Sequence, residues 1–367
     1  MTLNELPDEP TTETAVSPSA TTTDSTQTSN PVQIIEVHSK ESNRTPFWVL
    51  IAVSLGFLLP VFACGFLALV SFVGLGIATA GITSSGPTST STGFGDAVAI
   101  VRVEGTILDS DSTEYSSDAT SGVVIADLEA AANDDLVKAI VLRVNSPGGT
   151  VTGSAQIYET IKEIDKPVIV SMGGTAASGG YYISAPADYI FARSDTTTGS
   201  LGVVLTLFNA VELGEKVGIS VESITSGPNK AIGSPWEELT EEQRDILNEY
   251  IDESYEEFVR IIADGRGMSK EEVYAIADGR IYSGRQALDL NLVDELGNLN
   301  DAIAKAADLG GIAGEPNIIE YERIPSFTDI LFGFSSQIGK TDAERVTETF
   351  DALTAPTLEY RYVAPGQ

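Results

Sequence analysis

The chain has 367 residues, with 53 acidic against 21 basic side chains and a formal net charge of −32. Such a surface repels phosphates, which excludes nucleic acid as a partner and argues against other phosphate-binding roles. The single cysteine, Cys64, and the single histidine, His38, exclude an intrachain disulfide and a histidine-based metal site, and we predict no metal or cofactor. The charge fits an acidic cytosolic protein or a halophilic one, and the scarcity of lysine favours the halophilic interpretation.

The first part of the chain contains one long uncharged segment between two polar ones. Residues 1–45 are rich in Thr, Ser, Pro and Asp, which predicts a disordered tail. Residues 46–82 include an uncharged apolar run that exceeds the roughly 20 residues of a membrane helix. We therefore expect one transmembrane helix, in contact with the lipid bilayer through residues 47–73. The composition of residues 83–95 predicts a flexible linker.

Basic residues predict the orientation of this span. Lys40 and Arg44 precede it, whereas the next basic residue after it is Arg102. By the positive-inside rule we expect a cytoplasmic N-terminus and an extracellular domain, which places the protein in the cell membrane.

Short apolar runs alternate with amphipathic segments after the linker. We expect strands over 97–105, 138–145 and 167–172, and helices over 123–135, 154–165 and 239–267. This alternation predicts an α/β domain with a parallel β-sheet over residues 96–325. Thr240 and Gln243 form a predicted capping box at the start of the long helix. Its predicted buried face consists of Ile246, Leu247, Tyr250, Ile251, Phe258 and Ile262. Residues 326–367 lose periodicity and are predicted to be a weakly ordered C-terminal tail.

Two glycine-rich turns follow consecutive predicted strands. They are "VNSPGGT" (144–150) and "GGTAASGG" (173–180). The carboxyl ends of parallel strands form the ligand crevice of such sheets, so both turns point to one place. Ser178 could act there as a nucleophile, with backbone N–H groups as an oxyanion hole worth roughly 3–4 kcal/mol per donor. Taken alone, each motif is a weak signal, since an SPGG turn is more often purely structural and AASGG also fits a close contact between a helix and a strand. Because the only histidine precedes the membrane span, the base would have to be a lysine or a carboxylate.

Four motifs in register resemble the signal peptide peptidase A family, peptidase family S49, in its short form with one catalytic domain. They are "RVNSPGG", "AASGGYYISAPAD", "TGSLGV" and "DGRIYSGRQALDLNLVDELG", within residues 97–325. The resemblance implies a ClpP/crotonase-like fold and a membrane-anchored serine endopeptidase that cuts remnant signal peptides. It also implies homo-oligomers that enclose the active sites.

The resemblance also implies roles for individual residues. Ser178 is the implied nucleophile, Lys230 in "TSGPNKAIGSP" the base, and Ser200 the residue that hydrogen-bonds the lysine amine. The implied oxyanion donors are the N–H groups of Gly179 and of the Pro-Gly-Gly turn, Gly149 rather than Gly148.

The chemistry of a serine–lysine pair agrees with this assignment. A lysine amine serves as a base near neutral pH only when burial among apolar groups lowers its pKa from about 10.4. No acidic residue adjoins Lys230 in the sequence. Composition alone favours a surface lysine in a Gly/Pro-rich loop, whereas the family resemblance implies a buried amine, which we expect. Substrates would be extended peptides that add a strand to a sheet edge beside the site.

Two other functions remain open at this point. One is a crotonase-like acyl-CoA enzyme, which the acidic surface argues against because CoA carries phosphates. The other is a catalytically silent membrane scaffold that binds peptides, and the presence of both Ser178 and Lys230 argues against it.

Overall fold

The computed structural model describes residues 88–91, 93, 95–112, 118–322 and 357–362. The predicted N-terminal tail and membrane span, residues 1–82, lie outside these ranges. Within them, no helix has both the length and the apolar character that a membrane crossing requires.

Nine of the described strands form a mixed sheet. They are β1 (Thr88–Ser91), β2 (Ala97–Glu104), β5 (Val137–Ser146), β7 (Val168–Ala177), β8 (Tyr189–Ala192), β9 (Thr197–Gly199), β11 (Ile281–Ser283), β12 (Glu295–Leu296) and β13 (Asn317–Glu322). The order is β1-β13-β2-β5-β7-β8-β12, and β9 pairs with both β7 and β11. The pairs between β13 and β8 along this order are parallel, which confirms the predicted parallel α/β sheet.

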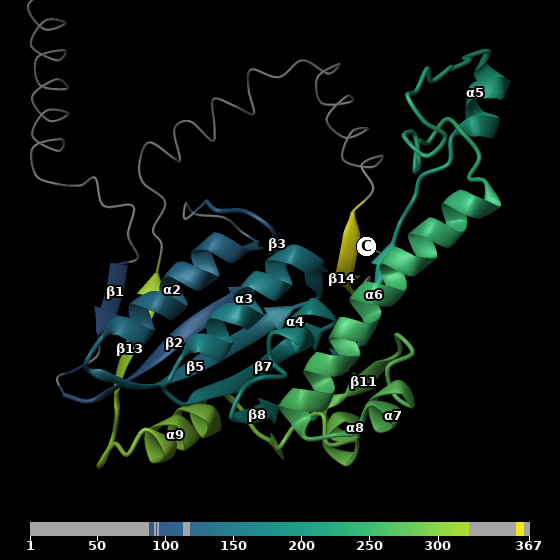
Figure 1. Cartoon of the computed structure of the whole chain (residues 1–367). Helices are drawn as coiled ribbons and strands as arrows, with labels where there is room; N and C mark the ends of the chain where they lie inside the picture. The colour runs from purple at the N-terminus through teal and green to yellow at the C-terminus, as the bar shows by residue number, and fades with distance from the viewer. Residues whose placement is uncertain (1–87, 92, 94, 113–117, 323–356, 363–367) are drawn as a thin grey trace, which may run out of the picture. The chain divides into compact units, whose positions relative to one another are not determined.

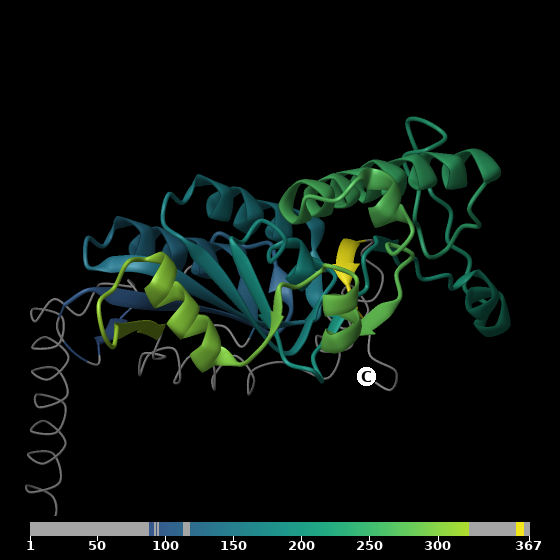
Figure 2. The ribbon, with the colours of Figure 1, turned by 90° about the horizontal axis from the view of Figure 1, so that it is seen from below.

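Helices cover both faces of this sheet (Figures 1 and 2). The helices α2 (Ser121–Asn133) and α3 (Val151–Glu163) pack on one face, where Leu128 and Ile157 join the larger buried cluster. The helix α9 (Leu299–Leu309) packs on the other face, where Ala306 contacts a second cluster that includes Phe191. Because both faces are covered, β2, β5 and β7 are almost continuously apolar, as expected of buried parallel strands.

Five short strands form a second sheet at the carboxyl ends of the central strands. They are β3 (Ile107–Leu108), β4 (Ala119–Thr120), β6 (Gly148–Thr150), β10 (Val204–Leu205) and β14 (Leu358–Arg361), in the order β10-β14-β6-β3-β4. β6 follows β5 directly and leads into α3, so this small sheet lies where the sequence predicts the crevice.

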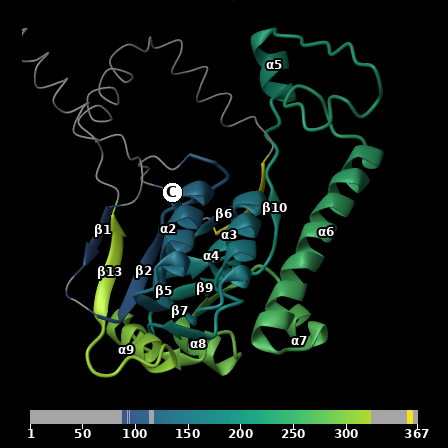
Figure 3. The same ribbon diagram turned by 60° about the vertical axis from the view of Figure 1, so that its left-hand side comes forward.

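The remaining helices are α4 (Gly179–Tyr182), α5 (Val211–Val217), α6 (Glu241–Arg266), α7 (Lys270–Tyr274) and α8 (Gly284–Asp289). The predicted capping box of α6 is confirmed, since Thr240 Oγ1 accepts from Gln243 N and the Gln243 side chain accepts from Thr240 N. The predicted apolar face is buried only in the C-terminal half of α6, at Phe258 and Ile262. Ile246 and Tyr250 are 40% and 53% exposed, because the first turns of α6 extend past the sheet (Figure 3).

Residues 206–240, which we call the arm, precede α6 and include α5. Figures 1 and 3 show the arm projecting away from the sheets at the N-terminal end of α6. Several large apolar side chains of the arm are exposed, namely Phe208, Leu213, Val217, Ile219, Val221 and Ile224, the last of them 96% exposed.

Two strands lie in segments for which the sequence predicts no regular structure. β1 falls in the predicted linker and pairs antiparallel with β13, with Ser91 opposite Ile319. β14 falls in the predicted weakly ordered tail and pairs with β6 and β10. Both strands depend on pairing with distant residues, so the local sequence carries only a weak signal for them.

Candidate active site

Ser178 lies at a strained junction between a strand and a helix. β7 ends at Ala177 and α4 begins at Gly179. The backbone of Ser178 adopts φ 54° and ψ −116°, and its side chain is buried. A non-glycine residue pays for such a conformation in backbone strain of order 1–3 kcal/mol, a cost that is concentrated at functional sites.

Backbone hydrogen bonds hold this junction in place. Ser178 N donates to Gly199 O at 2.8 Å, and the N–H groups of Tyr181 and Tyr182 donate to Ser178 O at 2.9 and 2.8 Å. Both tyrosine side chains are buried beneath the junction. The position of Ser178 is therefore fixed from β9 on one side and from the first turn of α4 on the other.

The glycines of the two turns lie side by side. A Cβ on Gly148, whose φ is +93°, would stand 2.5 Å from Gly179 N. The same Cβ would stand 2.0 Å from the carbonyl oxygen of Tyr360, and a Cβ on Gly179 would stand 3.0 Å from that oxygen. Gly149 lies close to a different neighbour, because a Cβ added to it would stand 1.9 Å from Ile107 O in β3. The two turns thus meet, and a carbonyl group already lies against them.

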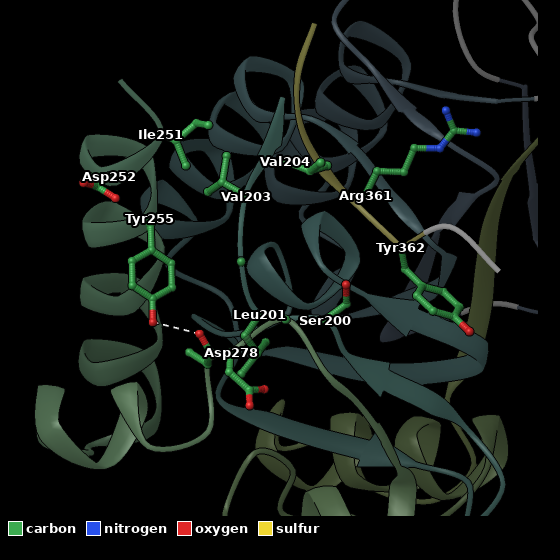
Figure 4. A pocket seen from close by; sticks show the side chains of 13 residues that line it. Ser200, Leu201, Val203, Val204, Ile251, Asp252, Tyr255, Asp278, Arg361 and Tyr362 are labelled. Carbon is green, nitrogen blue, oxygen red and sulfur yellow. Dashed lines mark hydrogen bonds between the residues drawn. The ribbon is translucent and has the colours of Figure 1, made fainter. Parts of the chain in front are cut away.

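Ser200 lies beside Ser178 at the end of the neighbouring strand. Ala177 of β7 pairs with Gly199 of β9, so the residues that follow, Ser178 and Ser200, leave the sheet together. Ser200 also has a positive φ, of 50°, and its N–H donates to Arg280 O at 2.7 Å. It faces a cavity of about 590 Å³ that is also lined by Leu201, Tyr255, Asp278, Arg361 and Tyr362 (Figure 4).

Lys230 does not lie near Ser178 within one chain. Pro228, two residues earlier, accepts a hydrogen bond from Gln243 near the start of α6, whereas Phe258 of the same helix packs on Tyr182 of α4. The fifteen residues from 243 to 258 span about 22 Å of helix at 1.5 Å per residue. The Lys230 side chain is exposed on the arm. The expectation of a buried amine is therefore wrong for the described residues of the single chain, in which Lys230 is exposed.

The C-terminal strand β14 occupies the crevice. It runs antiparallel to β6 on one side, with Tyr360 opposite Gly149, and antiparallel to β10 on the other, with Val204 opposite Glu359. Tyr362 N donates to Pro147 O at 2.7 Å. We did not predict this strand from the sequence, although the alternation of Leu358, Tyr360 and Tyr362 with charged residues is a period-two signal.

Comparisons with known proteins match the described domain to two peptidase families. The profile described as Peptidase family S49 matches residues 160–313, which include Ser178, Ser200 and Lys230, and the Clp protease profile matches residues 107–195. The chain is 42% identical over 200 residues to "Putative protease MJ0651" of Methanocaldococcus jannaschii, which is 54% of this chain and 63% of the relative. It is 45% identical over 188 residues to "Putative protease slr0021" of Synechocystis, 51% of this chain and 67% of the relative.

A longer relative is matched over one third of its length. The chain is 42% identical over 217 residues to "Protease 4" of Haemophilus influenzae, which is 58% of this chain and 34% of that protein. The matched segments thus span between one third and two thirds of these relatives. With the fold, the serine junction and these matches in place, the chain belongs to peptidase family S49.

Proposed function

We propose that this protein is a membrane-anchored serine endopeptidase with a Ser178–Lys230 dyad. One observation carries the proposal. An extended peptide segment lies in the crevice with the carbonyl oxygen of Tyr360 against Gly148 and Gly179, directly beside Ser178. A scissile carbonyl must reach this place for a serine at the start of α4 to attack it.

The crevice is a slot for one extended strand. β10 pairs only with β14 among the described residues, and β6 has β14 on its free edge. Removing β14 would leave two strand edges, those of β6 and β10, which run in the same direction and are separated by the width of one strand. A substrate peptide that fills the slot would make main-chain hydrogen bonds on both sides, the mode of binding known as strand addition. The main chain would supply affinity, so unfolded segments of many sequences could enter.

The proposed reaction is acyl transfer to Ser178. Its Oγ attacks the scissile carbonyl carbon while the Lys230 amine takes the hydroxyl proton. The N–H groups of Gly179 and Gly149 hold the oxyanion, and loss of one such donor costs about 3–4 kcal/mol. The N–H of Gly148 donates to Ser146 Oγ at 3.1 Å, which supports Gly149 as the second donor. Lys230 returns the proton to the leaving amine, water hydrolyses the ester, and Ser200 orients the amine.

Lys230 would reach the Ser178 of a second copy of this chain. The apolar side chains exposed along the arm form a surface that a protein of net charge −32 would not leave in water without a partner. Packing the arm against a neighbouring protomer would bury this surface and carry its lysine into an apolar setting. Burial of this kind is the general way in which a lysine becomes a base near neutral pH. A closed homo-oligomer would result, with each site shared by two chains.

The proposed location rests on the uncharged segment in the first part of the chain, and the proposed substrates rest on the similarity to one relative. The uncharged run within residues 46–82 would anchor the peptidase, with the N-terminus cytoplasmic and the domain outside. The chain is 42% identical over 182 residues to "Putative signal peptide peptidase SppA" of Enterococcus faecium, of which it spans 53%. Remnant signal peptides and other unfolded segments near the membrane are therefore the proposed substrates.

Hydrolysis of casein and of fluorogenic peptides tests the proposal. The full chain in detergent and high salt should cut both, and a fluorophosphonate should stop the reaction. A folded protein that binds peptides without cutting any of them would instead favour the catalytically silent scaffold.

We expect Gly148→Ala to disable peptide hydrolysis. The new Cβ would occupy the place of the substrate carbonyl, and displacing that carbonyl by about 1 Å can cost about a hundredfold in kcat/KM. Gly311→Ala is the matched control, because Gly311 also has a positive φ, of +70°, with nothing within 4 Å of its Cβ. Equal activity of the two variants would contradict the assignment of Gly148 to the peptide slot.

The net charge predicts dependence on salt. Raising the salt concentration toward 1 M shortens the Debye length to about 3 Å and weakens repulsion among the acidic side chains. We expect the thermal unfolding midpoint, followed by circular dichroism, to fall when the protein is moved from high salt to dilute buffer. An unchanged midpoint would contradict the halophilic interpretation.

A further inference from the structure

The strand that leads to the proposed nucleophile contains a bulge. Val144 of β5 pairs with Met172 of β7, whereas Ser146 of β5 pairs with Ala176. One residue of β5 therefore lies opposite residues 173–175 of β7, and the register of the two strands shifts at this point. Bulges are over-represented beside active sites, where they change the direction of the side chains that follow.

The bulge is also the place where β7 changes its neighbour. Residues 169–171 pair with β8, whereas residues 175–177, after the bulge, pair with β9. The second pairing places Ser178 N 2.8 Å from Gly199 O, to which it donates. A change of register between two strands moves every residue that follows it. The register beyond the bulge therefore sets where Ser178 lies relative to Ser200.

Three side chains make hydrogen bonds with main-chain groups of the bulge. The bonds run from Arg143 Nη1 to Met172 O at 3.0 Å, from Thr196 Oγ1 to Gly173 O at 2.7 Å, and from Thr175 N to Asn145 Oδ1 at 3.1 Å. A bulge disrupts the regular ladder of a sheet, and a main-chain group that is buried without a partner costs about as much as a lost hydrogen bond. These side chains therefore stabilise the bulge where the ladder is interrupted.

The Thr196 hydroxyl has a fixed direction. Thr196 is 1% exposed and lies in the turn before β9. Its hydroxyl accepts from Arg193 N at 3.0 Å, and its own N–H donates to Arg193 O at 3.1 Å. Because the hydroxyl oxygen already accepts this bond, its proton is free to donate to Gly173 O.

Asn145 contacts the bulge from the opposite side, on β5. A Cβ added to Gly173 would stand 2.8 Å from both the Cβ and the Oδ1 of Asn145, so the side chain lies directly against the bulged backbone. Asn145 is nevertheless exposed at its outer side. A hydrogen bond from Thr175 N is thus the only bond that this side chain makes among the described residues.

We propose that Asn145 and Thr196 are positioning residues for Ser178. They hold the bulge of β7 in the register that places the serine beside Ser200 and the glycine turns, and both act through the backbone of β7. This inference rests on the proposed peptidase function. It predicts that loss of either side chain slows the attack on the substrate and leaves peptide binding unchanged, because a displacement of about 1 Å can cost about a hundredfold in rate.

Two substitutions at Thr196 separate positioning from folding. In the full-length protein, Thr196→Val should lower kcat about 10- to 100-fold with KM within a few-fold of the wild type, and Thr196→Ser, which keeps the hydroxyl, should restore kcat. Labelling of Ser178 by a fluorophosphonate should slow by the same factor and still reach completion. A purely structural role would instead lower the extent of labelling and leave its rate unchanged. Thr160→Val is the matched control, since it removes a hydroxyl bond to Gln156 O within α3.

The same comparison applies to Asn145. Asn145→Ala should lower kcat as Thr196→Val does, whereas Asn145→Asp keeps an oxygen for the N–H of Thr175 and should remain within a few-fold of the wild type. Asn298→Ala is the matched control, because Asn298 is another exposed asparagine whose Oδ1 accepts from a main-chain N–H. Since Asn145 is exposed, its variants test the proposal even if Thr196→Val fails to fold.

Hydrogen exchange followed by mass spectrometry gives a readout that needs no activity. The N–H groups of Thr175 and Ser178 are both hydrogen-bonded, and they should exchange at least tenfold faster in Thr196→Val and Asn145→Ala than in the wild type and the controls. Unchanged exchange in both variants would overturn the proposal whatever their activity, and faster exchange with unchanged kcat would reject the positioning role. Faster exchange in a protein whose wild type cuts no peptide would instead retain the control of the bulge over Ser178 and reject the peptidase function.

Discussion

Replacing Ser178 by alanine is expected to reduce kcat by a factor on the order of 10⁴ to 10⁶, as in other enzymes whose nucleophile and base act as a unit. The serine hydroxyl is the only group in the proposed mechanism that forms a covalent bond with the substrate. The variant should keep its fold, because the backbone of Ser178 donates a hydrogen bond to Gly199 and accepts hydrogen bonds from Tyr181 and Tyr182. Hydrolysis of a fluorogenic peptide, with circular dichroism of the same sample, measures both effects.

Ser171→Ala is the matched control for this variant. Ser171 is also buried and lies on β7, the strand that leads to Ser178, but its hydroxyl accepts a hydrogen bond from Arg143 at 2.8 Å. We expect its kcat to stay within a few-fold of the wild type. Substantial hydrolysis by a folded Ser178→Ala protein would show that another group attacks the substrate.

Replacing Lys230 by alanine is expected to reduce kcat about as strongly as replacing Ser178, because neither group works without the other. Lys216→Ala is the matched control, since Lys216 is another exposed lysine of the arm and pairs with Glu212. Substantial activity in Lys230→Ala would mean that the base lies elsewhere.

Mixing the two inactive proteins tests whether the site is shared between chains. Co-expressed Ser178→Ala and Lys230→Ala chains should recover activity, because the lysine of the first would serve the serine of the second. For random pairing of equal amounts, half of the chains carry the serine and half of those meet a lysine, so about a quarter of wild-type activity is expected in a cyclic assembly. Mixed oligomers that remain inactive would contradict a dyad formed between chains.

The central sheet and the serine junction could be predicted because their signals are local. Each central strand is a short apolar run, and Thr240 and Gln243 mark the start of α6 within four residues. The glycine turns before Thr150 and around Ser178 predicted a common crevice, because parallel strands end at one edge. The separation in space between the Lys230 segment and the serine junction could not be predicted from the sequence. Lys230 fits the family motif, yet its segment is bonded to Gln243, which lies about 22 Å along α6 from Phe258, the residue that packs on Tyr182 of α4.

The features that could not be predicted from the sequence depend on pairing between distant residues. β1, β13 and β14 are short and partly polar, and each exists because an edge of a sheet is available to it. Tyr182, Phe258 and Tyr360 pack together from α4, α6 and β14, so no single motif contains this cluster. The exposed first half of α6 was mistaken for a buried face because its apolar periodicity continues past the end of the sheet.

The most direct test of the account is the site of covalent capture by a fluorophosphonate in the full-length protein. The reagent should phosphonylate Ser178 alone, as mapped by mass spectrometry, and peptide hydrolysis should be lost in proportion to the labelling. Labelling should fail in both Ser178→Ala and Lys230→Ala. Modification of a different residue, or hydrolysis that continues after Ser178 is fully labelled, would contradict the assignment of Ser178 as the nucleophile.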